Sequence, residues 1–549
     1  MKKTICIVLV LIMLLCVCAC GNQSASAPAP VDSVPSPDGI VQVQEGQDAT
    51  AQNENAAITE KPDGIQPGTV FTFASTKDYP LYCPWIDNRA QDFLFQLYDN
   101  LLQRHMGNAN DVRPALAESY TISDDGLTYV FTLRQDAFFS DGEQVNADAF
   151  VYTWKNATEE YQPRYFEMID SYEATSEFEL TIKLKYPCAN FLTTTCAEPQ
   201  QGPVSPKALE QYGKEDNRSA VGCGPYIVES YTPGEGFVLK ANTNYYNELK
   251  QPSIETINFS VIPDLNTQIV AFESGQIDCL VFTSCDTYQL LKDHGFNVLA
   301  VPDRTQPMWL NARQVECFRD IRVREAIAHM IDWNEVNALA FNGLFHIPDS
   351  YIEGPGGYPD DDGAYDYDPE LGRKLIEEAG YKLEDIKFTL LADPDMTVYC
   401  VVIAQMLNDN GLVNVDTQTL DGMTCYGMLK GGTYDAFIQC NGYSLVDCLT
   451  GYKMGLPLGC TQPVCWLYYE NMDAYNEAME WYQKALTSTN YDDYTANTAQ
   501  ITRIAQENYA AVGSYTGYRF WAIQDKFSGA YPTVGLSYMD FAYLYNNEG

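Results

Sequence analysis

Three cysteines near the start of the chain, Cys16, Cys18 and Cys20, form the densest group of residues that could do chemistry. A structural zinc site needs four ligands, typically a C-x2-C pair joined to further Cys or His residues. Here the thiols alternate along the chain, and the first histidine is His105. The spacing therefore predicts no metal site at these thiols.

The segment that holds these thiols has the form of a secretion signal. Lys2 and Lys3 precede an apolar run of sixteen residues, 5–20, which is shorter than the roughly 20 residues that span a bilayer. The residues Val-Cys-Ala-Cys at 17–20 resemble the bacterial lipobox, whose cysteine receives a diacylglyceryl group before cleavage. We therefore predict a lipoprotein signal peptide at residues 1–19, lipid attachment at Cys20, and anchoring on the outer face of the bacterial cytoplasmic membrane.

Composition changes after these cysteines. Residues 21–67 are rich in Ala, Ser, Pro, Gln and acidic residues, with Lys61 as their only basic residue and no aromatic. Such a segment buries too little apolar surface to fold, so residues 20–68 are predicted to be a disordered tether. The whole chain has 74 acidic and 33 basic residues, a formal net charge of -41. Because binding to nucleic-acid phosphates needs clustered Lys and Arg, we predict no nucleic-acid partner.

Motifs for catalysis are missing from the sequence. There is no H-E-x-x-H, no G-x-S-x-G and no phosphate-binding P-loop. The acidic stretch 359–370 fails as a calcium loop, because Tyr358 and Pro369 would occupy positions that require carboxylates. We therefore predict that the protein is not an enzyme and carries no cofactor or metal. The four histidines are too far apart for paired zinc ligation: His105, His294, His329 and His346.

Thirteen cysteines follow Cys20. An exported protein can form disulfides, but sequence does not give their connectivity, and an anaerobic habitat would leave thiols reduced. Three pairs are close enough in sequence to bond: Cys188/Cys196, Cys440/Cys448 and Cys460/Cys465.

The stretch 113–157 predicts a hairpin followed by an amphipathic helix. Residues 123–126, Ser-Asp-Asp-Gly, are typical of a turn, and residues 127–134 alternate as a strand. Asn146 can cap the following helix, which would carry Phe150, Val151 and Trp154 on one face.

This arrangement resembles the signature of the family-5 extracellular solute-binding proteins, the receptors of oligopeptide, dipeptide and nickel ABC importers. Cys223 stands where that family usually has Thr, and Gly372 where it usually has Ala. Local structure also explains several landmarks, since Asp320 can cap a helix and pair with Arg322. Further segments resemble landmarks of the family in the same order: GCGPYIVESY at 222–231, LKANTNYYN at 239–247, AFESGQIDCL at 271–280, FRDIRVREAIAHMIDWNEV at 318–336 and YDYDPELGRKLIEEAGY at 365–381.

The resemblance implies an α/β fold of the periplasmic-binding-protein-like type II, with two lobes joined by a hinge and an extra inserted domain (cluster C). The N-terminal lobe would comprise residues 69–103, 219–301 and 516–549. The inserted domain would be residues 104–218, and the second lobe residues 302–515. Ligand would lie in a cleft between the lobes.

The function implied is that of a monomeric, lipid-anchored receptor that captures oligopeptides and delivers them to an ABC permease. The 39 Tyr and 7 Trp residues keep open an oligosaccharide or another small solute as ligand. A peptide sensor of the same fold is the third alternative.

Resemblance also implies the site residues. In oligopeptide-binding relatives a carboxylate just after a Gly-Trp pair receives the α-ammonium of the peptide. Here Tyr443 replaces the Trp and Asp447 comes one position late, which makes Asp447 the candidate. For each candidate a packing role is the alternative interpretation. The other predicted ligand-binding residues are Asp87, Asn88, Tyr165, Trp309, Asn441 and Tyr515.

Overall fold

The computed structural model describes residues 61–79, 83–85, 91–105, 108–158, 166–348, 366–438, 443–444, 472–530 and 538–548. All of them belong to one compact unit, Gly39–Gly549. Several predictions fall outside the described residues: those for Cys20, Asp87, Asn88, Tyr165, Asn441 and Asp447, and for the pairs Cys440/Cys448 and Cys460/Cys465.

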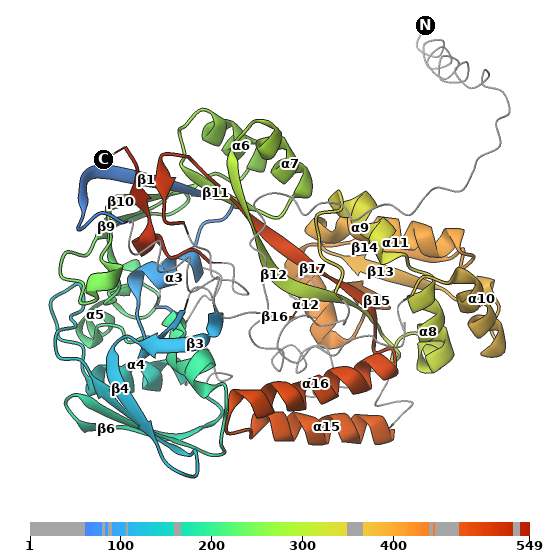
Figure 1. Cartoon of the computed structure of the whole chain (residues 1–549), viewed down its shortest axis with the longest axis horizontal. Coiled ribbons are helices and arrows are strands. Elements are labelled where there is room, and N and C mark those ends of the chain that lie inside the picture. Colours follow the sequence, from blue (N-terminus) through green and yellow to red (C-terminus); the bar gives the residue numbers. More distant parts are fainter. Residues whose placement is uncertain are drawn as a thin grey trace, which may run out of the picture. The chain divides into compact units, whose positions relative to one another are not determined.

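One mixed sheet of eleven strands dominates the described part of the chain (Figure 1). Its parallel pairs are β1 with β10 and β11, and β13 with β14 and β15. The order along the sheet is β14 (Val415–Thr419), β13 (Phe388–Ala392), β15 (Ala436–Ile438), β12 (Asn297–Leu310), β17 (Ala511–Ile523), β11 (Cys279–Phe282), β1 (Gln66–Ser75), β10 (Ile254–Val261), β9 (Gly236–Ala241) and β8 (Tyr226–Thr232), with β16 (Tyr443–Ser444) beside β12.

Helices connect and cover these strands, as a mixed α/β sheet requires. Figure 1 shows α6 and α7 beside β11, and α9 to α11 near β13 and β14. The described α-helices are α3 (Gln91–Leu97), α4 (Ala147–Thr158), α5 (Pro206–Tyr212), α6 (Leu265–Glu273), α7 (Cys285–Asp293), α8 (Ile321–His329), α9 (Trp333–Phe341), α10 (Pro369–Glu378), α11 (Thr397–Asp409), α12 (Gly422–Gly431), α15 (Met472–Leu486) and α16 (Tyr491–Glu507).

Strands β12 and β17 pass through the middle of the large sheet and pair antiparallel along most of their length. The pairing has two irregularities, one between Pro302 and Arg304 and one between Pro307 and Trp309. Proline has no N–H to donate to a neighbouring strand, so such irregularities are expected beside it. Between them lie four regular pairs, residues 304–307 opposite 514–517, which we call the crossover segment.

A smaller antiparallel sheet confirms the predicted hairpin and helix. Asn146 accepts a hydrogen bond from the Ala149 N–H at 3.0 Å and so caps α4. Trp154 of α4 is fully buried, and its indole N–H donates to the Gln201 carbonyl at 2.7 Å. The sheet order is β4 (Ala117–Ile122), β5 (Thr128–Leu133), β7 (Glu179–Leu184) and β6 (Ile169–Ser176); the remaining two-stranded sheets pair β2 (Leu102–His105) with β3 (Asn108–Pro114) and β18 (Phe527–Ser528) with β19 (Tyr545–Asn546).

Two large hydrophobic cores lie on either side of the crossing strands. Successive side chains of a strand point to opposite faces. Accordingly, Phe520 and Ala522 of β17 join one core, whereas Trp521 and Ile523 join the other. β17 is therefore packed on both faces at this end.

The predicted start of α8 is confirmed. Asp320 accepts from the Arg322 N–H at 3.0 Å, and its carboxylate pairs with the Arg322 guanidinium at 2.5 Å. The structure also gives a physical reason for Gly372, which stands where the family usually has Ala. A Cβ at this position would lie 2.8 Å from the Met330 side chain and 2.9 Å from the Ala326 carbonyl, so α10 packs on α8 too closely for alanine.

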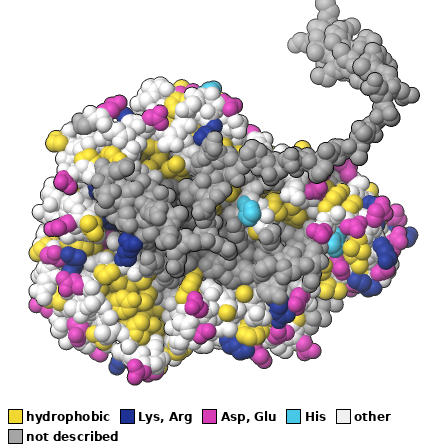
Figure 2. Space-filling model, viewed as in Figure 1, with side chains coloured by type: hydrophobic (Ala, Val, Ile, Leu, Met, Phe, Trp, Pro, Cys, Tyr) yellow, Lys and Arg dark blue, Asp and Glu magenta, His cyan; other side chains and the backbone are white. Residues whose placement is uncertain are grey.

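Acidic side chains lie at the surface, as a solvated excess of charge requires. Figure 2 shows them gathered at the right-hand end, where Figure 1 places α10. On that helix Glu370 pairs with Arg373 at 2.6 Å and Glu378 with Lys374 at 3.5 Å. Such exposed pairs contribute little to stability.

The end of the predicted tether is wrong. β1 begins at Gln66, and the Gln66 side-chain amide bonds both the N–H and the carbonyl of Asn546 at 2.8 Å. Lys61 donates to the carbonyls of Gln251 and Ala542. Polar side chains thus attach residues 61–68 to the body through backbone partners that composition does not reveal.

Cys188 and Cys196, which are close enough in sequence to bond, form no disulfide with each other. Both are buried, and the Cys188 thiol donates to the Asn190 side chain at 3.0 Å. All nine cysteines within the described ranges are buried.

Gly513 provides a test of this packing. It has φ +123°, and a Cβ there would overlap the Trp333 ring at 2.2 Å. We expect Gly513→Ala to destabilise the protein by about 2 to 5 kcal/mol, through backbone strain and overpacking. Gly142→Ala is the matched control, because Gly142 also has positive φ (+87°) but nothing within 4 Å of its Cβ position. Urea unfolding followed by tryptophan fluorescence measures both, and equal losses would contradict the packing described here.

Candidate functional site

The crossover segment is the first candidate site, because a solute held between two lobes would lie against the strands that join them. Its pairs are Arg304–Gly517, Thr305–Thr516, Gln306–Tyr515 and Pro307–Ser514. The backbone of β16 joins its edge, with Tyr443 opposite Thr305. One predicted site residue, Tyr443, is thereby brought beside β12 from far along the sequence.

One face of the crossover segment is aromatic. Tyr515 is fully buried, with its hydroxyl 2.8 Å from the Met396 sulfur. Its ring lies 5.0 Å from Phe341 and 4.6 Å from Tyr399, measured between ring centroids. Burial raises the pKa of Tyr399 well above its ordinary value, so this phenol stays neutral.

Trp309 lies in the same core and is 5% exposed. The sequence predicts ligand contact for both Trp309 and Tyr515, whereas the structure packs both side chains against protein. Their contact with a ligand stays a prediction.

The opposite face of the crossover segment carries hydroxyls. Thr305, Ser514 and Thr516 are all buried, and the Thr305 and Thr516 hydroxyls lie 3.3 Å apart. Ser514 is 4% exposed, and its Oγ has no hydrogen-bond partner within the described structure. A buried polar group left unpaired costs about 1 to 3 kcal/mol. Sequence reasoning missed this face, because Ser and Thr in a strand give no signal of their own.

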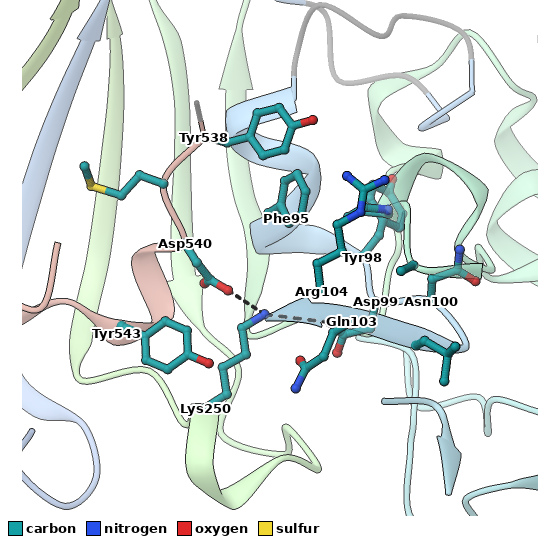
Figure 3. Close-up of a pocket in the computed structure, with 14 residues that line it drawn as sticks. Phe95, Tyr98, Asp99, Asn100, Gln103, Arg104, Lys250, Tyr538, Asp540 and Tyr543 are labelled. Carbon is teal, nitrogen blue, oxygen red and sulfur yellow. Dashed lines mark ion pairs between the residues drawn. The ribbon is translucent and has the colours of Figure 1, made fainter. Parts of the chain in front are cut away.

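A second candidate is a small polar cavity between the N-terminal part of the chain and its C-terminal segment (Figure 3). Its volume is about 40 Å³, room for a few water molecules. Figure 3 shows Lys250 pointing between two carboxylates, Asp540 at 2.6 Å and Asp99 at 4.0 Å. The lining includes Phe95, Tyr98, Arg104, Lys250, Asp540 and Tyr543.

The electrostatics of this cavity are those of a structural ion cluster. Burial raises the pKa of Asp99, although Lys250 and the Tyr245 hydroxyl, which donates at 2.8 Å, act against the rise. Burial alone would lower the pKa of Lys250, but Asp540 and Asp99 outweigh it and raise it. Each charge therefore depends on its partners to stay buried.

The neighbourhood of the cavity ties separate parts of the chain together. Arg104 pairs with Glu198 at 2.6 Å, and the Asn100 amide donates to the carbonyls of Thr195 and Glu198. The Gln96 side chain donates to the Met539 carbonyl at 2.9 Å and accepts from the Phe541 N–H at 3.1 Å. The cavity thus lies in a joint that holds three distant segments in place.

Two further searches concern the described residues only. Among them, no group of three or more His, Cys, Asp or Glu side chains is placed to hold a metal ion. None of the described helices combines the length and apolar character needed to cross a membrane.

A match to a protein family identifies the class of protein. Residues 111–455 match the family described as bacterial extracellular solute-binding proteins, family 5 Middle. This match covers more than half of the chain, so the chain belongs to that family.

Individual relatives differ in what they bind. The glutathione-binding protein GsiB of Salmonella typhi is 31% identical over 277 residues, which are 49% of this chain and 53% of GsiB. The chain thus spans about half the length of that relative. NikA from Brucella suis, solved with Fe(III)-EDTA, matches with a TM-score of 0.73 at 22% identity. The match covers 87% of this chain and 100% of the NikA chain. The periplasmic binding protein DppA from Helicobacter pylori, solved with the peptide STSA, matches with a TM-score of 0.70 at 19% identity. This match covers 87% of this chain and 98% of the DppA chain.

These matches confirm the predicted family and the predicted α/β fold of type II binding proteins, with its two lobes. Family 5 consists of extracellular solute-binding proteins, which confirms the prediction that the chain is not an enzyme.

The ion cluster gives a stability prediction. Lys250→Met leaves Asp540 and Asp99 buried without their cation, and we expect a loss of about 3 to 5 kcal/mol in the free energy of unfolding. Adding Asp540→Leu should recover part of this loss, because one buried charge is removed. Lys207→Met is the control, since Lys207 makes an exposed pair with Glu143 at 3.4 Å and should lose less than about 1 kcal/mol. Urea denaturation midpoints measure all three, and similar losses for Lys250 and Lys207 would refute the cluster's role.

Proposed function

We propose that this protein is the substrate-binding receptor of an ABC importer and captures oligopeptides between its two lobes. The observation that carries the proposal is the pair of long strands, β12 and β17, which runs between two cores and is interrupted at both ends of the crossover segment. Interrupted pairing at two places lets a few residues absorb a rotation of one lobe against the other.

The proposed division of the chain follows these strands. The N-terminal lobe would be residues 69–103, 219–301 and 516–549, with residues 104–218 inserted and residues 302–515 as the second lobe. Ligand that touches both lobes would favour the closed arrangement, and the permease would recognise the closed form.

Peptide is the proposed ligand class. DppA was solved with a peptide, and GsiB is named for glutathione, which is itself a tripeptide. An extended peptide offers main-chain groups that can be bound without reading its sequence. The rival ligands are an oligosaccharide or another small solute, such as the metal chelate bound by NikA, and a sensor role is the other alternative.

The proposed site residues on segments outside the described ranges are Asp447 for the peptide α-ammonium, and Asp87, Asn88, Tyr165 and Asn441 as further contacts. We also propose that Cys20 carries the lipid that holds the receptor, as a monomer, at the outer face of the cytoplasmic membrane. Mass spectrometry of the mature N-terminus would show that lipid, and a mature chain beginning elsewhere without it would end this part of the proposal.

The decisive experiment combines a ligand screen with one substitution. Thermal shift with tetrapeptide, oligosaccharide and nickel-chelate libraries should show stabilisation by peptides. With a peptide found in this way, Asp447→Asn should weaken binding by about 2 to 5 kcal/mol, or roughly 30-fold to several thousand-fold, because a charge-assisted hydrogen bond is lost.

The loss should depend on the free peptide amine. N-acetylation should weaken binding strongly in wild type and little in Asp447→Asn, since the mutant already lacks the interaction. Asp416→Asn, an equal charge change at an exposed position of β14, should leave affinity unchanged. Calorimetry measures the four combinations. Equal effects of acetylation in wild type and mutant would exclude Asp447, and stabilisation by sugars or chelates alone would exclude peptide as the ligand class.

A further inference from the structure

We propose that the hydrogen bond between Asn342 and Asp286 is a latch, which holds the two lobes in their closed arrangement and slows the release of a bound ligand. The inference rests on the proposed division of the chain into lobes. Asp286 lies in the first turn of α7, in the proposed N-terminal lobe, and Asn342 ends α9, in the proposed second lobe. Both residues lie outside the crossover segment, so the pair acts by positioning the lobes.

The bond itself crosses between the lobes. The Asn342 side-chain amide donates to the Asp286 carboxylate at 3.0 Å, and both residues are exposed. They are 56 residues apart in the sequence, and β12 lies between them, since α7 precedes this strand and α9 follows it. A rotation at the crossover would therefore separate the two side chains. The bond belongs to one arrangement of the lobes only.

The backbone at the end of α9 presents the amide in a fixed position. Asn342 is the C-cap of α9 and has left-handed φ 55° and ψ 27°, a conformation that Gly adopts best and Asn next. The Asn342 N–H donates to the Asn337 carbonyl. The Asn337 side chain bonds both the carbonyl and the N–H of Phe345, at 2.6 and 3.1 Å. The turn that carries the latch is thus tied to α9 on both sides.

Aromatic rings already join the same two parts of the chain. Tyr288 of α7 contacts Phe520 of β17, with ring centroids 4.7 Å apart. Phe345, just after α9, contacts Tyr518 of β17 at 5.9 Å. Tyr518 and Phe520 lie 6.4 Å from each other, so a row of rings runs along β17 from α7 to the turn after α9. The latch adds an exposed polar bond to this apolar contact between the lobes.

The lobes also meet at a second place, which indicates that the arrangement is closed. A Cβ placed on Gly126, in a turn of the proposed inserted domain, would lie 3.8 Å from the Thr489 methyl group. Thr489 lies between α15 and α16, in the proposed second lobe, and Figure 1 shows these helices reaching toward the inserted sheet. Lobes that touch at two places beyond the crossover are not swung apart.

Asn342→Gly is the test, because it removes the amide and keeps the backbone. Glycine adopts positive φ without penalty, so the thermal unfolding midpoint of the ligand-free protein should stay unchanged or rise slightly. The dissociation rate of a tetrapeptide found in the screen should rise about 2-fold to 10-fold, because the closed complex loses one exposed hydrogen bond. Stopped-flow fluorescence with a labelled peptide measures this rate.

Two further variants complete the experiment. Val413→Gly is the matched control, because Val413 also has left-handed φ (57°), is 60% exposed and lies on the second lobe, between α11 and β14. It should release the peptide at the wild-type rate. Asp286→Ala should speed release as much as Asn342→Gly does, and the double variant should release no faster than either, since both substitutions remove the same bond.

The other outcomes overturn the latch. They are release from Asn342→Gly at the wild-type rate, additive effects of Asp286→Ala and Asn342→Gly, and a lower unfolding midpoint in Asn342→Gly, which would assign the residue to folding. Failure of the proposed ligand class is distinguishable from these. If an oligosaccharide or a metal chelate binds in place of peptides, the same variants test the latch with that ligand. If no ligand of the screen binds, the proposed function fails, and the latch fails with it.

Discussion

The pairing of β12 with β17 is the constraint on which the rest of the structure depends. Their pairing is regular from Asn297 to Pro302 and across the crossover segment, is irregular beside Pro302 and Pro307, and ends with the single pair of Trp309 and Ala511. The middle stretch is short, carries aromatic rings on one face and hydroxyls on the other, and receives β16 at its edge. A binding protein of two lobes needs both a firm connection and a place to bend, and in the proposed function this ladder would supply them together.

Polar contacts as well as apolar packing hold the N-terminal part of the described chain together. Lys250 is buried between Asp540 and Asp99, and these carboxylates raise its pKa against the effect of burial. The Gln96 side chain holds the backbone of residues 539 and 541 as a neighbouring strand would. The C-terminal segment is thereby fixed to the same body as β1, so a rotation at the crossover would move a whole lobe.

The local elements were predicted well because their partners are close in sequence, whereas the fold as a whole was predicted from resemblance to the family. The Asn146 cap of α4 and the Asp320 cap of α8 are set by neighbouring residues, and both are present. Tertiary partners could not be predicted from the sequence. Gln66 is hydrogen-bonded to Asn546, and Lys250 forms an ion pair with Asp540, each several hundred residues away. A lone Lys or Asp in so acidic a chain resembles any surface charge, and the spacing of Cys188 and Cys196 gave no sign that both would be buried without a bond to each other.

The position of Tyr515 in the crossover was predictable, whereas the direction of its side chain was not. Resemblance pointed to Tyr515 at the final crossover, and the structure does place that residue there, but with its ring in the core and its neighbours Ser514 and Thr516 turned to the opposite face. The difference is one of strand register, which periodicity alone cannot assign when both faces are buried.

Small-angle X-ray scattering of the protein with and without a saturating peptide tests the central claim, that the lobes close about the crossover. The account predicts a smaller radius of gyration in the complex, and an unchanged radius with peptide demonstrably bound would contradict it.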